Sequence, residues 1–430
     1  MGSRPVTLEA YWRLLRTNRN FRLLWMAQVV SELGDWLYSV AVYSLLLDLT
    51  GTAKSVATAV VLQVLPQFFV SPMAGVLNDR VRRKRVMIAA DLARAAIVLG
   101  MVVVRSPGMV PLLYLLLFAE TVMWAFFEPG RTAILPVLTG NEADTAAANG
   151  LSSTTWSVNL ALGAAAGGLI AVLLGRNALF VLNAASFLLS AALVSRMRVC
   201  ETHAGGQTAF RARDLFDYTP FVEGIRYVQA DRRLLATLLV KAGQGFLGVH
   251  WVILPILGER VFPVAPEALG AHRGGMLGMS LLFGARGVGS LLGPLVSGYW
   301  AGNDQRRLRA GIFGGFLAIA AGYLLLSGAT TLWQAAGTVI LAHAGGSTVW
   351  VFSTTLLHFQ TEDRFRGRVF SADFGFLTLA MAMVTAAGGV ALDGGVSVRM
   401  VAFCTGALAF LPAALWWNAQ RLWTRPAKVP

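Results

Sequence analysis

Residues 54–105 run KSVATAVVLQVLPQFFVSPMAGVL, then NDRVRRKR, then VMIAADLARAAIVLGMVVVR, so two apolar stretches flank a short and strongly basic gap. Each stretch is about as long as the roughly 20 residues that an α-helix needs to cross a bilayer. Strands of a membrane barrel would instead alternate in polarity over about 10 residues. The pattern therefore predicts two transmembrane helices joined by a cytoplasmic loop, since arginine and lysine accumulate on that side.

The same alternation of apolar stretch and hydrophilic gap continues along the chain. The protein is 56% apolar and 13% charged, with a mean hydropathy of +0.62, whereas soluble domains are about one quarter charged. Twelve membrane-spanning helices are expected, near residues 22–48, 54–77, 86–105, 110–127, 149–174, 178–196, 234–258, 275–301, 308–327, 331–357, 369–392 and 397–418. A hydrophilic linker at 198–233 separates two pseudo-symmetric six-helix halves, 1–197 and 234–430. The predicted fold class is an all-α membrane protein.

The basic residues predict how the chain is oriented in the membrane. Every second gap is rich in arginine, beginning with the segment before residue 22 and the loop at 78–85, except the gap after residue 127, which holds only Arg131. The alternate gaps hold little positive charge. An even number of spans with both termini in the cytoplasm explains this distribution. No cleavage site follows the basic N-terminal segment, so the first helix is expected to direct insertion into the bacterial inner membrane.

Composition and motifs argue against several other classes of protein. The net charge of +14 comes from residues in short gaps rather than from one basic surface, so no nucleic-acid partner is expected. The two cysteines, Cys200 and Cys404, support neither a disulfide framework nor a metal site. The sequence contains no G-x-S-x-G, H-E-x-x-H or P-loop motif, so an enzyme is not expected.

The first expected helix carries a polar face. Gln28, Glu32, Asp35 and Ser39 recur at spacings of three and four residues, which places them on one side of a helix. Two carboxylates one turn apart in a medium of low dielectric constant cannot both ionise at small cost. Glu32 and Asp35 are therefore candidates for binding a proton or a cationic substrate. The alternative is a structural pair that a basic residue on a neighbouring helix neutralises.

Ionisable residues inside a membrane are costly, and by default they mark a transport path. The residues expected to line a central cavity are Gln28, Glu32, Asp35, Glu120, Lys241, Gln244 and Arg286. For Lys241 and Arg286, substrate contact and structural pairing are equally open. Asp91 and Arg94, at positions i and i+3, are expected to form a structural ion pair near the cytoplasm.

The loop after the second segment resembles a known family signature. GVLNDRVRRKR (75–85) is similar to the cytoplasmic motif G-x-L-x-D-R-x-G-R-[KR] of the major facilitator superfamily, with Arg82 at the place of its second glycine. The matching residues are Gly75, Leu77, Asp79, Arg80, Arg83 and Lys84. The resemblance implies the major facilitator fold, in which this gating motif holds the two halves together. Asp79 would then face the positive N-terminal end of the eleventh helix.

A second signature lies in the fifth segment. Gly150, Gly163, Gly167 and Gly168 fall on the spacing of the antiporter motif g-x8-G-x3-G-P-x2-G-G, from which Asn159 and Ala164 depart. Close helix packing alone is the alternative explanation for these glycines. The stretches at 18–38, 126–151, 180–191 and 363–371 are also similar to the enterobactin-exporter and macrolide-efflux branch. This resemblance implies proton-driven export of a siderophore or a drug.

The predicted function is therefore secondary active transport across the membrane. The leading interpretation is a proton-coupled exporter of a small molecule that works by alternating access, with the proton gradient as its energy source and no cofactor. An importer or uniporter of a small solute is the alternative, and a non-transporting membrane scaffold is the alternative of another class. The expected partners are a small-molecule substrate and the lipid bilayer, and a monomer is expected. Acids and bases together permit anionic, cationic or zwitterionic cargo.

Overall fold

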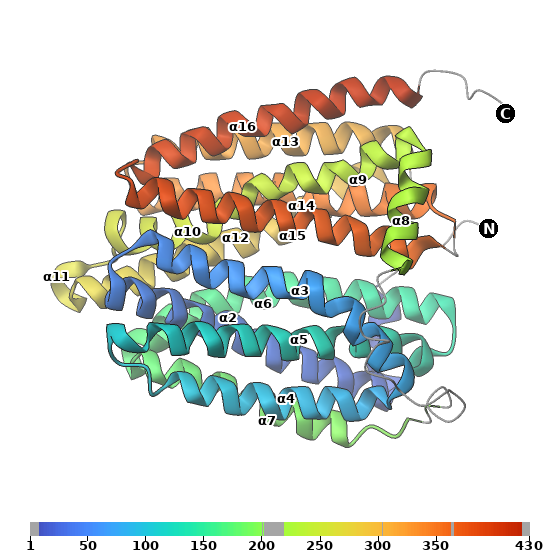
Figure 1. The fold of residues 1–430 in the computed structure, drawn as a ribbon, viewed down its shortest axis with the longest axis horizontal. Helices are drawn as coiled ribbons and strands as arrows, with labels where there is room; N and C mark the ends of the chain where they lie inside the picture. Colours follow the sequence, from blue (N-terminus) through green and yellow to red (C-terminus); the bar gives the residue numbers. More distant parts are fainter. Residues whose placement is uncertain (1–7, 200, 202–218, 303, 363–364, 424–430) are drawn as a thin grey trace. The chain divides into compact units, whose positions relative to one another are not determined.

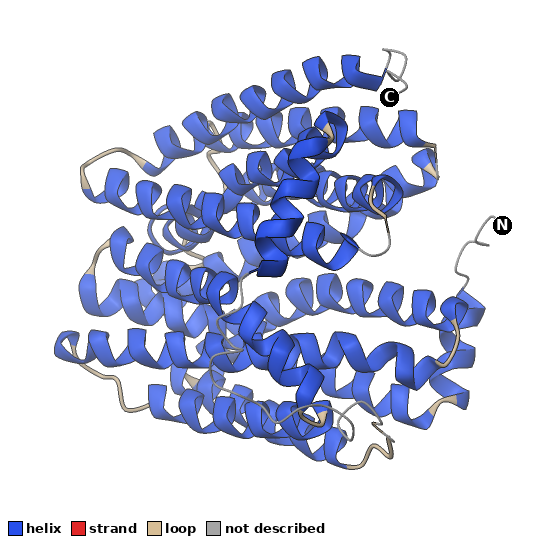
Figure 2. Ribbon diagram, turned by 45° about the vertical axis from the view of Figure 1, so that its right-hand side comes forward, coloured by secondary structure: helices blue, strands red, loops and turns tan. Residues whose placement is uncertain are grey.

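The secondary structure agrees with the class expected from composition. The computed structural model describes residues 8–199, 201, 219–302, 304–362 and 365–423. Every regular element in these ranges is a helix, and all of them are drawn in blue in Figure 2. A helix satisfies its own backbone hydrogen bonds, which lipid cannot do. The all-α prediction is confirmed for this part of the chain.

The chain divides into two compact units, which we describe separately. Unit 1 comprises residues 1–49 and 69–217, and unit 2 comprises residues 50–68 and 218–430. The division falls inside one long helix, α3 (Ala53–Arg80). The six-helix halves at 1–197 and 234–430 stay a prediction, because residues 50–68 belong to unit 2 here.

Unit 1 consists of long helices joined by short turns (Figure 1). Its elements besides part of α3 are α1 (Leu8–Thr17), α2 (Arg19–Thr50), α4 (Arg83–Met101), α5 (Val110–Thr139), α6 (Glu142–Leu174) and α7 (Arg176–Ser195). Helix α4 packs against both α5 and α7.

The turn between α5 and α6 is determined by the residues within it. Gly140 adopts a left-handed φ of 73°, which favours glycine, and Asn141 then caps α6 by accepting the Asp144 N–H at 2.8 Å.

Unit 2 is also helical. Its elements are α8 (Thr219–Ala230), α9 (Arg232–Gln244), η4 (Gly245–Val249), α10 (His250–Ile256), η5 (Leu257–Val261), α11 (Pro266–Leu269), α12 (Ala271–Ala301), α13 (Gln305–Ser327), α14 (Leu332–Gln360), α15 (Arg366–Asp393), α16 (Val398–Ala419) and η7 (Gln420–Trp423). Helix α14 packs against α9, α12 and α13, and α15 packs against α9. Asp304 caps α13, and the backbone N–H of Arg306, which it accepts at 2.7 Å, keeps the pKa of this exposed carboxyl below its ordinary value.

The first part of α3 is attached to unit 2 by a helix cap. Asp393, the last residue of α15, accepts hydrogen bonds from the backbone N–H groups of Ala53 at 2.7 Å and Lys54 at 2.9 Å. A carboxylate at a helix N-terminus satisfies unpaired donors and complements the helix dipole. Gly389, one turn earlier in α15, lies close to Ala57. These contacts explain why residues 50–68 belong to unit 2.

Ten helical segments in the described ranges are long and apolar enough to cross a membrane. The two other segments expected to span it coincide with α2 and α4. Helix α2 contains Glu32 and Asp35, and α4 begins with RKR and contains Asp91 and Arg94. The protein is therefore a multi-pass membrane protein, and the full count of twelve spans stays a prediction.

The predicted linker at 198–233 contains a short helix. Residues 202–218 of this segment lie outside the described residues, and α8 follows them. Glu223 of α8 forms an ion pair with Arg368 of α15 at 2.6 Å. Tyr227 stacks on Phe365 with ring centroids 4.1 Å apart, and Val228 is buried in a small apolar cluster with residues of α9, α14 and α15. Helix α8 thus packs against the rest of unit 2 through its apolar residues.

Candidate functional site

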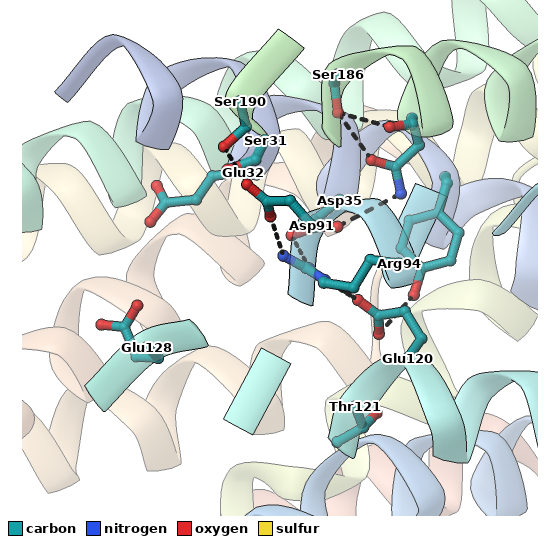
Figure 3. A network of polar contacts seen from close by, with 12 residues as sticks. Ser31, Glu32, Asp35, Asp91, Arg94, Glu120, Thr121, Glu128, Ser186 and Ser190 are labelled. Atoms are coloured by element: carbon teal, nitrogen blue, oxygen red, sulfur yellow. Dashed lines mark hydrogen bonds and ion pairs between the residues drawn. The ribbon is translucent and has the colours of Figure 1, made fainter. Parts of the chain in front are cut away.

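A buried arginine in unit 1 binds two of the predicted site residues at once (Figure 3). Arg94 of α4 donates from Nη2 to Oδ2 of Asp35 in α2 at 2.8 Å, and from Nε to Oε1 of Glu120 in α5 at 2.8 Å. The Arg94 side chain is only 2% exposed, that of Glu120 is 7% exposed, and that of Asp35 is 25% exposed. Asp35 thus has the most exposed of these three side chains.

The expected Asp91–Arg94 ion pair is present, but it is the weakest contact of Arg94. The Asp91 Oδ1 atom lies 3.8 Å from Nη1 of Arg94, whereas Ser190 of α7 donates to the Asp91 Oδ2 atom at 2.6 Å. Asp91 is completely buried. From the sequence, this ion pair was expected to be separate from the proton-binding candidates Glu32 and Asp35. The structure joins the pair to Asp35, because Arg94 is the common partner of three carboxylates. We call Arg94, Asp35, Glu120 and Asp91 the Arg94 cluster.

Helix α7 holds the Arg94 cluster in place. Asn183, Ser186 and Ser190 recur at spacings of three and four, so they share one face of α7. Asn183 donates to Asp35 Oδ1 at 3.4 Å, and the guanidinium group of Arg94 lies 3.9 Å from the ring centre of Phe187. Gly34, beside Asp35, permits the close approach of α7 to α2, since a Cβ there would meet the side chains of Asn183 and Ser186.

The charges of the Arg94 cluster do not balance if every group is ionised. Three carboxylates surround one guanidinium group, which leaves two excess negative charges in a buried place. Buried charges are stable only when they are paired, and an excess carboxylate in low dielectric therefore takes up a proton or a cation. The arrangement is therefore chemically suited to binding a proton.

The Glu32 carboxylate points away from Arg94, as Figure 3 shows, and it belongs to a second polar group. Its Oε1 accepts a hydrogen bond from Gln28 at 2.9 Å, and Gln28 accepts one from Arg131 at 3.1 Å. Arg131 donates from Nη2 and Nε to the two carboxylate oxygens of Glu128, at 2.5 and 2.8 Å. Asn159 of α6 donates to Glu32 at 3.3 Å. Glu32 and Asp35 are therefore not one isolated carboxylate pair, because each has its own arginine-centred surroundings.

Two glycines of the antiporter-like motif, Gly163 and Gly167, line the contact between α6 and α2. A Cβ on Gly163 would lie 2.7 Å from the Trp36 Cβ atom, and one on Gly167 would lie 3.0 Å from the Leu37 carbonyl oxygen. Gly168 is buried, and a Cβ on Gly150 would meet the Tyr11 hydroxyl at 2.8 Å. Small residues let membrane helices approach closely. Close packing thus accounts for Gly163 and Gly167, and their part in transport stays a prediction.

Gly163→Ala is expected to destabilise the protein by about 1–3 kcal/mol, as overpacked substitutions do, because the backbones of α2 and α6 must separate. The midpoint of thermal unfolding in detergent measures the change. Gly314→Ala is the matched control, since a Cβ on Gly314 of α13 meets nothing within 4 Å. Equal midpoints for the two variants would contradict the packing role of Gly163.

The basic gating motif contacts its own unit. Arg83 donates to the carbonyl oxygen of Ala133 at 2.9 Å, and Lys84 donates to those of Ser195 and Met197, each at 2.7 Å. Glu201 caps α4 by accepting the Arg83 N–H at 2.7 Å. Gly75 has open space where a Cβ would stand, and Arg80 is half-buried at the end of α3. The side chain of Asp79 lies outside the described residues, so its expected role stays a prediction.

In unit 2, Lys241 is paired with a carboxylate. Its Nζ atom lies 2.5 Å from Oδ2 of Asp373 in α15, and both side chains are buried. Gln244, one turn further along α9, donates to the carbonyl oxygen of Gly346 at 2.9 Å. Arg286 lies over the ring of Trp251 at 4.2 Å. The structure places these predicted residues in unit 2 and the acids in unit 1, so one common cavity stays a prediction.

Sequence reasoning missed Asp373, Glu128 and Arg131. Asp373 lies inside the apolar stretch expected at 369–392, and an ionisable residue within a span is by default functional. That rule would have found it. Glu128 and Arg131 follow the stretch expected at 110–127, which α5 extends to Thr139, so they were placed in a loop. Helix α5 continues through Pro129 and Pro136, and prolines are tolerated inside membrane helices.

A family model described as transmembrane secretion effector matches residues 11–424. The MFS-type transporter YkuC of Bacillus subtilis is 27% identical over 65% of this chain and 65% of its own length, just under two thirds. Macrolide efflux protein A of Streptococcus pyogenes is 27% identical over 87% of this chain and 89% of its own length.

Among solved structures, one of a POT family transporter in complex with a thioalcohol-conjugated peptide superposes with a TM-score of 0.73. The two sequences are 11% identical, and the match covers 95% of this chain and 97% of that one. At such low identity the likeness concerns the fold alone. It agrees with the helical architecture of the described residues.

Proposed function

Because the chain belongs to the transmembrane secretion effector family of major facilitator transporters, we propose that it exports a small molecule from the cell in exchange for protons. Export proceeds by alternating access, in which a binding site opens to one side of the membrane and then to the other. The proton gradient is the energy source, and the protein lies in the bacterial inner membrane with both termini in the cytoplasm.

The observation that carries this proposal is the charge imbalance of the Arg94 cluster. One buried guanidinium group faces Asp35, Glu120 and Asp91, so protonation of one carboxyl brings the cluster closer to neutrality. Asp35 is the most exposed of the three carboxylates and is therefore the one we assign to proton exchange with water. Losing the proton frees a carboxylate that again competes for Arg94. This competition changes the contacts between α2, α4 and α5.

Outward direction is supported by the relatives. Macrolide efflux protein A is, by its name, an exporter of macrolides, and its similarity extends over most of this chain. We therefore choose a macrolide as the first cargo to test. A drug or a siderophore remains within the proposed range of cargo.

Everted membrane vesicles test the proposal. Their respiration acidifies the interior, so a proton-coupled exporter should accumulate a radiolabelled macrolide inside them. An ionophore that dissipates the proton gradient should release the accumulated label within the time of the assay. Vesicles without the protein provide the baseline. Accumulation that persists after dissipation, or equilibration without accumulation, would refute proton-coupled export, and the second result would favour a uniporter.

A further inference from the structure

Three candidate membrane-spanning segments of unit 2 meet around one buried ion pair. Lys241 of α9 binds Asp373 of α15, and their side chains are 4% and 1% exposed. The Lys241 ammonium group also lies over the ring of Trp350 in α14, 4.4 Å from its centre. A carboxylate beside an aromatic face is a favourable place for an organic ammonium ion. Lys241 thus occupies a site that is chemically suited to ammonium groups.

This site has hydrogen-bond acceptors that Lys241 does not use. Among the described residues, the Oδ1 atom of Asp373 and the Oε1 atom of Gln244 are buried and have no hydrogen-bond partner. Gln244 follows Lys241 by three residues and so lies on the same face of α9. It bonds to Gly346, which is one turn from Trp350 on α14. Buried acceptors without donors are costly, and an alkylammonium ion has three donors to offer.

The charge count limits what can bind. One carboxylate, Asp373, balances the single positive charge of Lys241. A second cation at the same place would leave one excess positive charge in low dielectric, which is unfavourable. Lysine can lose its proton inside a protein, whereas arginine cannot. His358 of α14 is also near enough for the charge of Lys241 to act on it.

We propose that Asp373, Gln244 and Trp350 form a binding site for a protonated amine of the cargo, and that its binding expels one proton from Lys241. An N–H bond of the Lys241 ammonium breaks, its electron pair stays on nitrogen, and the proton leaves to water. The incoming ammonium ion takes over the Asp373 carboxylate, so the total charge is unchanged. The use of this exchange to drive export rests on the proposed function, whereas the cation site rests on the contacts in unit 2.

The experiment uses n-butylammonium chloride as probe, because n-butylamine is the lysine side chain without its backbone. Like lysine, with an ordinary pKa of about 10.4, the probe is protonated at pH 7 and releases no proton itself. Isothermal titration calorimetry of the purified full-length protein in detergent, repeated in phosphate and in Tris, gives both the binding and the number of protons released. We expect about one proton to be released per bound amine, because the single carboxylate of Asp373 can balance only one positive charge. Sodium chloride and 1-butanol are the ligand controls.

Lys241→Arg is the decisive variant. It keeps the positive charge and the pair with Asp373, but arginine cannot give up a proton in a protein. We expect proton release to disappear and amine binding to weaken at least tenfold, with the thermal midpoint near that of the wild type. If this variant does not fold, Lys241→Met with Asp373→Leu removes both charges together, which is tolerated far better than removing one. That variant should neither bind the amine nor release a proton.

The possible results separate the inference from the proposed function. No proton release by the wild type, release by Lys241→Arg as in the wild type, or equal response to 1-butanol would each overturn the amine site. In reconstituted vesicles, Asp35→Asn tests the Arg94 cluster alone. Loss of macrolide accumulation in Asp35→Asn, together with unchanged release in Lys241→Arg, refutes the inference and leaves the proposed function standing. Wild-type accumulation that persists after the proton gradient is dissipated, together with loss of proton release in Lys241→Arg, refutes the proposed function and leaves the amine site standing.

Discussion

Asp35→Asn is expected to abolish accumulation of the cargo while leaving the amount of folded protein near normal. With one proton exchanged per cargo molecule, a pH difference of about two units is worth about 2.7 kcal/mol, which supports roughly 100-fold accumulation. Asparagine cannot exchange a proton, so the accumulation ratio should fall to about one. The amide oxygen can still accept the hydrogen bond from Arg94, which preserves the contact between α2 and α4.

The measurement is the ratio of labelled macrolide inside and outside everted vesicles at several imposed pH differences. Asp48→Asn is the matched control, because Asp48 lies on the same helix, is 47% exposed, and has a long contact of 3.3 Å to Arg176. Its ratio should remain at the wild-type level. Wild-type accumulation by Asp35→Asn at every pH difference would remove Asp35 from proton exchange.

Arg94→Met is expected to have the largest effect on stability. It leaves Asp35, Glu120 and Asp91 without their common partner, and removing one side of a buried ion pair costs about 3–5 kcal/mol. We expect a large fall in the thermal midpoint and in the yield of purified protein. Methionine fills much of the space of the arginine side chain, so loss of charge rather than loss of volume is tested.

A rescue experiment identifies the cause of that loss. Adding Asp35→Asn and Glu120→Gln to Arg94→Met removes two of the three unbalanced carboxylates, and Asp91 keeps its hydrogen bond from Ser190. The triple variant should therefore be more stable than Arg94→Met alone. If Arg94→Met is as stable as the wild type, or if the triple variant is less stable still, the cluster is not held together by charge.

Some residues of the site could be predicted from local pattern. The polar face of α2 with Gln28, Glu32 and Asp35 follows from helical spacing, and Glu120 and Lys241 stand out as ionisable residues within apolar stretches. Their grouping was not predictable in the same way. Arg94 was expected to pair with Asp91, its neighbour at i+3, but its shorter contacts are to Asp35 and Glu120, which are 59 and 26 residues away.

The pairing of Lys241 shows the same limit. Substrate contact and structural pairing were equally open, and the structure pairs Lys241 with Asp373, which lies 132 residues away. Likewise, Gln28 joins Glu32 to Arg131 across 103 residues of sequence. Each helix has several faces, and the rotation of the helices about their axes decides which faces meet.

The amino-acid sequence by itself determined that the protein is built of helices, that lipid surrounds much of it, and that it resembles major facilitator exporters. These conclusions rest on runs of apolar residues, on short basic gaps and on glycine spacing, all of which are local properties of the chain. Only the tertiary structure decided that Arg94 serves three carboxylates and that Asp373 holds Lys241 beside Trp350. Charge neutrality in a buried place is a property of all the groups that packing brings together, so no single segment contains it.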